Sequence, residues 1–424
     1  MMCAVSEGRI KAMKLLLAKG ADVSLVDDTG ENILHEACLG GHVEIVEYVL
    51  SLEKVDIEQK GNYGRTPVMK AAEMGYREVL DVLVSKGGDT TAVDDKGNNI
   101  LHVACIGGNV DMVKHVLAED RINSKGQYGR TPVMMAACCR HRKVVEVLEN
   151  KGADISIVDN DGNNILHMAC IGGNVDVVKY VLTLDAVDIN SKGQYGRTPA
   201  RMADFRKHRE VFDLLMGKGA DLSQVDDQGD NILHMVCLEG HLELVKDIIT
   251  NNRVDINSRG RYGRTPVMKA AEKGHKEVFI FLMINRSDVF LKDDHDNNIL
   301  HMACLGGNLE MVQYIVSLCN MVEDINSRGQ YGRTPLLMAA GGGHTDVGKF
   351  LVDKGADVSL VDDDSNNILH LACYRGHEQF VKFVISKNVV DILAVNKQGL
   401  TAKKIAKELG DQTVNNVLYS SLLK

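Results

Sequence analysis

The chain has 424 residues, a formal net charge of −9 and a composition of 45% hydrophobic and 25% charged residues, with no tryptophan. This acidic balance argues against broad nucleic-acid binding, which needs a basic surface, and no apolar run approaches the length of a transmembrane helix. Because aromatic residues make up only 4% of the chain, we expect a core of aliphatic side chains.

The first segment, residues 1–26, begins "MMCAVSEGRIKAMKLLLAKG", with charged residues where a signal peptide would have an apolar run. It enters partway through a first helix, so we interpret it as a partial repeat. Six of the ten cysteines share one repeat position. We therefore expect reduced thiols and a cytoplasmic location, with the nucleus as the alternative.

Two phrases alternate through the rest of the chain and predict one continuous array. The phrase "NILHxAC" starts at Asn32, Asn99, Asn164, Asn298 and Asn367, with a near-copy, "NILHMVC", at Asn231. The phrase "RTPxxxA" has its threonine at Thr66, Thr131, Thr198, Thr265 and Thr334, with a degenerate copy at Thr401. Successive phrases are 32 to 36 residues apart, and no linker separates them.

Each repeat is predicted to form two short helices. Asn164 is a good N-cap, and Leu166 and Cys170 then fall on one helical face. In the alternate repeats Thr131 is the expected cap, and Pro132 takes the first helical position, where a missing N–H does no harm. Helix pairs this short cannot bury their apolar faces alone, which predicts stacking of neighbours.

The phrases "RTPVMKAAEKGHKEVFIFL" and "HVEIVEYVLS" resemble the ankyrin repeat. The resemblance implies an all-α solenoid of stacked helix-turn-helix units with projecting β-turn fingers. We expect a partial N-terminal repeat at 1–26, eleven repeats at 27–398 and a capping repeat at 399–424. The eleven repeats start near residues 30, 64, 97, 129, 162, 196, 229, 263, 296, 332 and 365.

Six His-x-x-Cys pairs raise the question of a metal site. Their histidines are His35, His102, His167, His234, His301 and His370. Residues three apart on a helix are neighbours, and His42, His241 and His377 offer a third ligand in three repeats. However, closed zinc sites need four ligands, and the next pair is two repeats away. The resemblance implies instead that these histidines bond backbone groups and are structural.

A near match to a phosphate-binding loop, "GHTDVGKF" at 343–350, is interpreted as chance. Phe350 replaces the hydroxyl residue that would bind Mg²⁺, and Gly348 and Lys349 fall inside a predicted helix. We therefore expect a non-enzymatic chain with no metal and no cofactor.

The turns before the repeats alternate between acidic and basic fingers. The basic fingers place tyrosine at Tyr63, Tyr128, Tyr195, Tyr262 and Tyr331, beside Arg65, Arg130, Arg197, Arg264 and Arg333. One interpretation is that neighbouring fingers pair their charges, which is weakly stabilising at a surface. The other is a partner-binding ladder, because Tyr and Arg are enriched in binding hot spots.

Two adjacent repeats of the "RTP" type replace the turn glycine by Arg140 and Lys207. The replacements add to a basic cluster that contains Arg140, Arg142, Lys143, Arg201, Arg206, Lys207 and Arg209. This is either drift on a solvated turn or a docking patch for an acidic partner, and Arg140, Arg142, Arg206 and Arg209 are its candidate binding residues.

Asn190 and Asn326 are candidate hydroxylation sites. Leu182, Asp188 and Ile189 precede Asn190 in the pattern that resembles the ankyrin-repeat site of asparaginyl hydroxylases, and Leu318, Asp324 and Ile325 precede Asn326 in the same way. Asn123 departs from the pattern because Arg121 replaces the acid.

These observations favour a non-catalytic protein–protein interaction scaffold or adaptor. We expect a monomer that binds a protein partner through its concave finger and first-helix surface, with no nucleic acid and no membrane insertion. The alternative is a substrate-recruiting subunit or fragment of a ubiquitin ligase or signalling protein whose catalytic part lies elsewhere.

Overall fold

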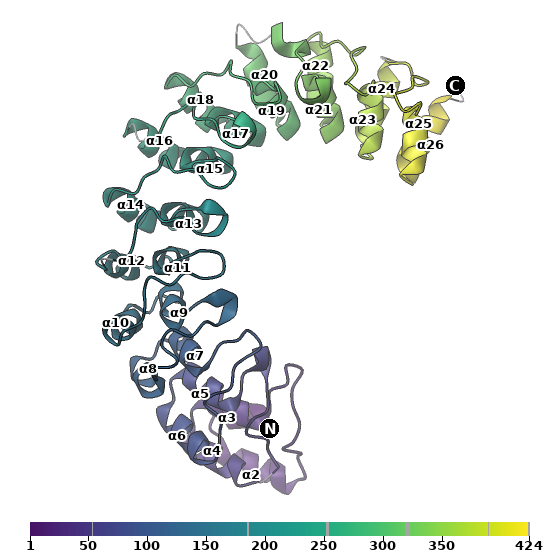
Figure 1. Cartoon of the computed structure of the whole chain (residues 1–424). Helices are drawn as coiled ribbons and strands as arrows, with labels where there is room; N and C mark the ends of the chain where they lie inside the picture. Colours follow the sequence, from purple (N-terminus) through teal and green to yellow (C-terminus); the bar gives the residue numbers. More distant parts are fainter. Residues whose placement is uncertain (53, 185, 252–253, 319–322, 389, 423–424) are drawn as a thin grey trace. The chain divides into compact units, whose positions relative to one another are not determined.

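The computed structural model describes the chain except for residues 53, 185, 252–253, 319–322, 389 and 423–424. The chain divides into two compact units, Met1–Asp221 (unit 1) and Leu222–Lys424 (unit 2). Within each unit, successive helix pairs form a continuous stack (Figure 1).

In unit 1, a layer of first helices packs against a layer of second helices. The first helices are α1 (Met2–Ser6), α3 (Ile33–Gly40), α5 (Pro67–Met74), α7 (Ile100–Gly107), α9 (Pro132–Cys138), α11 (Ile165–Gly172) and α13 (Pro199–Phe205). The second helices are α2 (Ile10–Ala18), α4 (Val43–Leu50), α6 (Arg77–Ser85), α8 (Val110–Val116), α10 (Arg142–Asn150), α12 (Val175–Val181) and α14 (Arg209–Gly217). Each first helix contacts the next one along the stack.

Unit 2 repeats this arrangement. Its first helices are α15 (Ile232–Glu239), α17 (Pro266–Lys273), α19 (Ile299–Gly306), α21 (Pro335–Gly342), α23 (Ile368–Tyr374) and α25 (Ala402–Glu408). Its second helices are α16 (Leu242–Thr250), α18 (Lys276–Ile284), α20 (Leu309–Ser317), α22 (Thr345–Asp353), α24 (Glu378–Lys387) and α26 (Gln412–Leu422).

Short 3₁₀ turns precede several first helices, and they form the tips of the basic fingers. They are η1 (Asn62–Gly64), η2 (Gln127–Gly129), η3 (Gln194–Gly196), η4 (Arg261–Gly263) and η6 (Gln330–Gly332), while η5 (Glu323–Asn326) follows α20. The only strand-like pairings among the described residues are two isolated bridges, Val26–Asn32 and Val395–Thr401. The expected all-α solenoid fold is therefore confirmed in each unit.

An asparagine–histidine capping box starts the first helix of every "NILH" repeat. The Asn164 side-chain oxygen accepts hydrogen bonds from the N–H groups of Leu166 and His167, both at 3.1 Å. His167 Nδ1 accepts from the Asn164 N–H in return, at 3.2 Å. The same box occurs at Asn32, Asn99, Asn231, Asn298 and Asn367. The predicted Asn caps are thus confirmed, and each box satisfies N–H groups that the helix itself leaves free.

The threonine caps are less uniform than predicted. The Thr334 hydroxyl accepts from the Leu337 N–H at 3.3 Å, whereas the buried Thr131 hydroxyl has no hydrogen-bond partner among the described residues. Thr131 therefore holds the N-cap backbone position of α9 without making the predicted side-chain bond. Pro132 occupies the first helical position as predicted.

The turns between the helices of a pair need a left-handed residue. Gly75 and Gly108 supply it with φ angles of 80° and 79°. Arg140 and Lys207 adopt the same region, with φ of 72° and 61°, where a side chain is disfavoured. The two basic residues that replace the turn glycine therefore keep its left-handed backbone conformation.

The core is mainly aliphatic, but among the described residues it also contains four phenylalanine rings, one of which, Phe383, is 6% exposed. Phe212, Phe279 and Phe380 are at most 1% exposed, which corrects the expectation of a purely aliphatic core. Gly348 makes room for one of them, since a Cβ there would lie 2.6 Å from the Phe380 ring. In the described part of the chain, no helix combines the length and apolar character needed to cross a bilayer.

Candidate functional site

The five basic fingers share one tip geometry. In the first finger the Gly61 N–H donates to the Arg65 carbonyl at 2.9 Å, and the Arg65 N–H donates to the Asn62 carbonyl at 3.3 Å. Tyr63 and Gly64 between them both have positive φ, 59° and 69°. Two left-handed residues in succession form the tight turn that suits a hairpin.

The tyrosine side chains of these tips are exposed. Tyr63, Tyr128, Tyr195, Tyr262 and Tyr331 are 53, 57, 60, 47 and 61% exposed. Each ring lies against the guanidinium of the arginine two positions later, with distances of 5.2 to 5.8 Å from guanidinium carbon to ring centroid. This contact orients the ring, and the Tyr63 and Tyr262 rings have a further cation nearby, from Lys96 at 4.4 Å and Arg261 at 4.7 Å.

Tyrosine is a poor choice for this turn on conformational grounds. A left-handed residue with a side chain costs about 1–2 kcal/mol, and asparagine or glycine avoids most of that cost. The tyrosine backbone bonds to the next finger, since the Tyr63 carbonyl accepts a hydrogen bond from the Asp95 N–H at 2.9 Å. Any residue has a carbonyl that can accept this bond. Backbone conformation alone therefore does not account for five repeated tyrosines in an exposed, left-handed turn.

Four of the five finger arginines lie close to a carboxylate of the acidic finger that follows. Arg65–Asp94, Arg130–Asp159, Arg264–Asp293 and Arg333–Asp362 are 3.6, 3.3, 3.4 and 3.3 Å apart. The four carboxylates are at most 1% exposed. The expected charge pairing is therefore present, but it is buried on the carboxylate side and is not a weak surface contact. Truncating a partner of such a pair leaves a buried charge.

The six repeated histidines are joined to the next finger. His301 Nε2 donates to the Arg333 carbonyl at 3.0 Å, and its Nδ1 accepts from the Asn298 N–H at 3.3 Å. This pattern assigns the neutral Nε2–H tautomer. Burial lowers the pKa of all six histidines, and it holds the pKa of His301 at about 4.

The cysteine of each His-x-x-Cys pair is a buried thiol. Burial raises the pKa of Cys38, Cys105, Cys170, Cys237, Cys304 and Cys373, for Cys373 to about 12. Metal ligation needs a thiolate and a free imidazole lone pair. Here the thiols are held protonated and both ring nitrogens are hydrogen-bonded. The cysteines are therefore suited to packing in the core, and the histidines to hydrogen bonding between neighbouring repeats.

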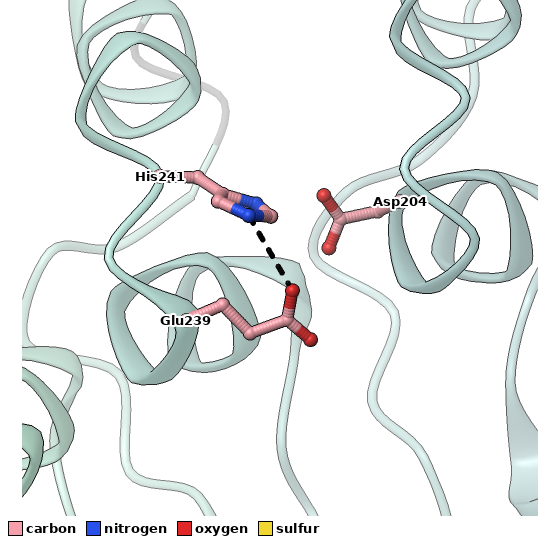
Figure 2. Close-up of side chains that lie close together, drawn as sticks. All are labelled: Asp204, Glu239 and His241. Carbon is pink, nitrogen blue, oxygen red and sulfur yellow. Dashed lines mark ion pairs between the residues drawn. The ribbon is translucent and has the colours of Figure 1, made fainter.

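His241, one of the three histidines that could add a third metal ligand, lies beside an acidic side chain. Figure 2 shows His241 beside Glu239, and the two form an ion pair of 3.6 Å at the start of α16 in unit 2. The other labelled residue, Asp204, belongs to α13 of unit 1. Meanwhile His234 Nε2 contacts the carbonyls of Ser258 and Arg264, both at 3.1 Å.

The basic cluster of unit 1 is partly neutralised by its own acids. Arg142 pairs with Glu146 at 3.6 Å, and Arg209 pairs with Asp213 at 2.8 Å. The Arg140 Nε donates to the Gly172 carbonyl at 2.5 Å. Arg206 is exposed and lies 5.9 Å from the Phe205 ring. The cluster therefore presents less free positive charge than the sequence indicated.

The two candidate hydroxylation sites have the same internal bond. The Asn190 side-chain oxygen accepts from the Asp221 N–H at 2.8 Å, and that of Asn326 accepts from the Asp357 N–H at 2.8 Å. Asn123 makes the equivalent bond to Asp154. Each asparagine thus links two repeats, and a hydroxylase would have to open that link to reach the side chain.

Sequence reasoning missed a pocket of about 450 Å³ in unit 2. Arg333, Leu337, Gly341, Tyr374 and Arg375 contribute to its lining. The only signal for it was the run Gly341–Gly343, which the other "RTP" repeats lack.

Family models for ankyrin repeats match nearly the whole chain. The model described as "Ankyrin repeats (3 copies)" matches residues 1–94, 86–159, 151–226, 201–293 and 279–362. A second model, "Ankyrin repeats (many copies)", matches residues 351–406.

The chain is also similar to segments of longer curated proteins. It is 24% identical to the human transient receptor potential cation channel subfamily A member 1, over 91% of this chain and 39% of the channel. It is 27% identical to the ubiquitin-protein ligase KEG of Arabidopsis thaliana, over 71% of this chain and 19% of the ligase. It is 28% identical to the ankyrin repeat protein nuc-2 of Neurospora crassa, over 58% of this chain and 23% of that protein. The chain thus spans less than half the length of each of these relatives.

Proposed function

This chain belongs to the ankyrin-repeat proteins, and from that premise we propose that it is a non-catalytic scaffold or adaptor that binds a partner protein through its finger tips and first-helix surface. A fold alone does not name a function. The observation that carries the proposal is the set of five exposed tyrosines in left-handed turns. Large aromatic side chains held by a neighbouring arginine suit a binding hot spot, because little side-chain entropy is lost on binding.

The test compares partners captured from a lysate of the native source. The bait is the whole chain or a variant with Tyr63, Tyr128, Tyr195, Tyr262 and Tyr331 changed to Asn. Asparagine tolerates the left-handed turn, so the fingers keep their shape while the rings are lost. Phe290→Asn in unit 2 is the control, because Phe290 is 59% exposed but lies outside the fingers.

A protein that is captured by the wild type and the control, and lost from the five-tyrosine variant, is the expected result. Equal capture by all three baits would show that the tyrosines are not the binding residues. Quantitative mass spectrometry provides the readout, and circular dichroism checks that the variant retains its helical content.

A second candidate is substrate recruitment within a larger ubiquitin ligase or signalling protein. It is favoured by the small share, 19% and 39%, of the ligase and the channel that the chain covers. An immunoblot of the native source distinguishes the two, because a free adaptor runs near 46.5 kDa, whereas a recruiting segment is found in a longer polypeptide.

We also propose that the chain is a monomer that does not bind nucleic acid and is located in the cytoplasm or nucleus. Its net charge of −9 disfavours binding to a polyanion. All nine cysteines in the described part of the chain are free thiols, as expected for a reducing compartment. Light scattering at the mass of one chain would support the monomer.

A further inference from the structure

Each finger arginine also lies near the residue eight positions later, on the first helix of the same repeat. Glu73 is that residue in the first finger and lies 2.7 Å from Arg65, and Glu272 lies 2.9 Å from Arg264. The chain therefore forms the same arginine–glutamate pair twice. In both cases the arginine Nε faces the buried aspartate of the next finger, and a terminal nitrogen binds the glutamate.

Three of the five fingers lack this glutamate: Cys138 and Phe205 take the position in the second and third fingers, and the last finger has a glycine there. The residue eight positions after Arg333 is Gly341, and a Cβ built there would meet nothing within 4 Å. The Arg333 Nε still faces Asp362 at 3.3 Å. Within the described part of the chain its terminal nitrogens make no ion pair, and its side chain is 31% exposed, compared with 13% for Arg65 and 15% for Arg264.

The missing glutamate leaves the pocket of about 450 Å³ in unit 2. Leu305, Leu337, Met338 and Tyr374 give it apolar walls, and Arg375 adds a second cation. Arg375 is exposed and forms no ion pair with any described residue.

We propose that this pocket accepts the side-chain carboxylate of a single aspartate or glutamate in a segment of a partner protein. The carboxylate would occupy the place that Glu73 and Glu272 fill in two of the other repeats, and it would bind the terminal nitrogens of Arg333. Charge-assisted bonds to a guanidinium fork are among the stronger hydrogen bonds in proteins. The inference rests on the proposed partner-binding function and names the chemistry of one contact.

The pocket also contains a carboxylate of its own, which limits what it selects. Asp364 is exposed and lines the pocket together with Arg333 and Arg375. It would repel a run of acidic residues. The pocket is therefore matched to a single carboxylate beside an apolar side chain, which the leucine and tyrosine walls can cover.

The test is a selection of displayed random heptapeptides against the whole chain, with each selected peptide then measured against three variants. Gly341→Glu restores the internal pair and fills the pocket, and glutamate is a better helix former than glycine. Gly341→Ala is the matched control, because it makes a similar backbone change and leaves the pocket open. Arg375→Gln, on an exposed turn residue, removes a cation without touching the buried Asp362 pair.

We expect peptides that share one acidic residue. Their affinity should fall at least about tenfold for the Gly341→Glu variant, and equally when the acidic residue of the peptide is replaced by its amide. It should fall severalfold for Arg375→Gln and should be unchanged for Gly341→Ala. Selection that yields no peptide, peptides without an acidic residue, or equal affinity for wild type and Gly341→Glu would overturn the inference. Capture of a partner that depends on the tyrosines but not on Gly341→Glu would also overturn it, while leaving the proposed function intact.

Discussion

The left-handed turn residues show how one backbone requirement is met by different side chains. Glycine fills most of these positions. The glycines and Thr-Pro pairs that recur in the repeats made these turns predictable from the sequence. The left-handed state of Tyr63 and its four equivalents was not predictable, because tyrosine has no preference for that region. The stack imposes it, since the tyrosine carbonyl must accept the bond from the next finger.

Tyr128→Asn tests whether the tyrosine at this turn lowers the stability of the fold. Asparagine relieves left-handed strain of about 1 kcal/mol, and loss of the contact with Arg130 removes about 0.5 kcal/mol of that gain. We expect the free energy of unfolding to stay level or to rise slightly, whereas Tyr128→Ala should lower it. Urea unfolding of the three proteins measures the effect, and an equal loss for both variants would mean that the ring itself stabilises the finger.

The buried histidines predict a dependence of stability on pH. A histidine in an unfolded chain has a pKa near 6.5, whereas folded His301 stays neutral down to a pH of about 4. As the pH falls through 6.5 the unfolded state takes up the proton first. The stability contributed by the neutral ring is therefore present above pH 6.5 and is lost as the pH falls toward 4, by roughly 2 kcal/mol at pH 5 for this site.

His301→Gln isolates that contribution. The variant should be less stable than wild type at pH 7.5, because the bond to the Arg333 carbonyl is weakened, and the difference should shrink at pH 5. Urea midpoints at the two pH values provide the comparison. A constant difference between the two proteins would show that His301 does not titrate in this range.

At the scale of the helix pair, the sequence predicted the elements better than their polar contacts. Cap residues, Pro132 and the turn glycines are local signals, so the helices could be placed from them. The side-chain partners depend on residues about 30 positions away, and the burial of Asp293 beneath Arg264 followed only from the stacking. For the same reason the pocket at Gly341 was not predictable, because it is formed by residues of several repeats.

One pair of positions varies together between repeats. Asp230 pairs with Lys269 at 3.0 Å and Glu31 with Lys70 at 2.8 Å, both largely buried. The other repeats have asparagine at the acidic position, as at Asn98, and an apolar residue at the lysine position. The Asn98 oxygen accepts from a finger N–H at 2.9 Å, just as the Asp230 carboxylate does at 2.8 Å.

A double-mutant cycle at Asp230 and Lys269 tests this coupling. Asp230→Asn and Lys269→Met should each destabilise unit 2 by about 2–4 kcal/mol, because each leaves a buried charge without its partner. The double variant reproduces the neutral pair of the sister repeats and should return close to wild type. Thermal unfolding of the four proteins gives the coupling free energy, and strict additivity would show that the two positions are independent.

At the scale of the whole chain, periodicity predicted the array because the same interface recurs about every 33 residues. It could not predict the division at Asp221, since the phrases continue across it unchanged. In a stack, each helix pair contacts only its neighbours, so stability is a sum of local terms and interface terms. A local change should therefore spread over adjacent pairs and no further.

Leu101→Ala in α7 tests how far such a change spreads. Leu101 is fully buried, and its truncation should cost about 2–5 kcal/mol locally. Hydrogen exchange read by mass spectrometry should show faster exchange in α7 and in α5 and α9, which pack against it, with no change in α21 of unit 2. Leu300→Ala in α19 is the reciprocal control, with faster exchange in α17 and α21 and none in α5. A single cooperative domain would instead exchange faster throughout in both variants, so uniform acceleration would contradict nearest-neighbour stability. Partner binding at one set of fingers would then affect the whole chain.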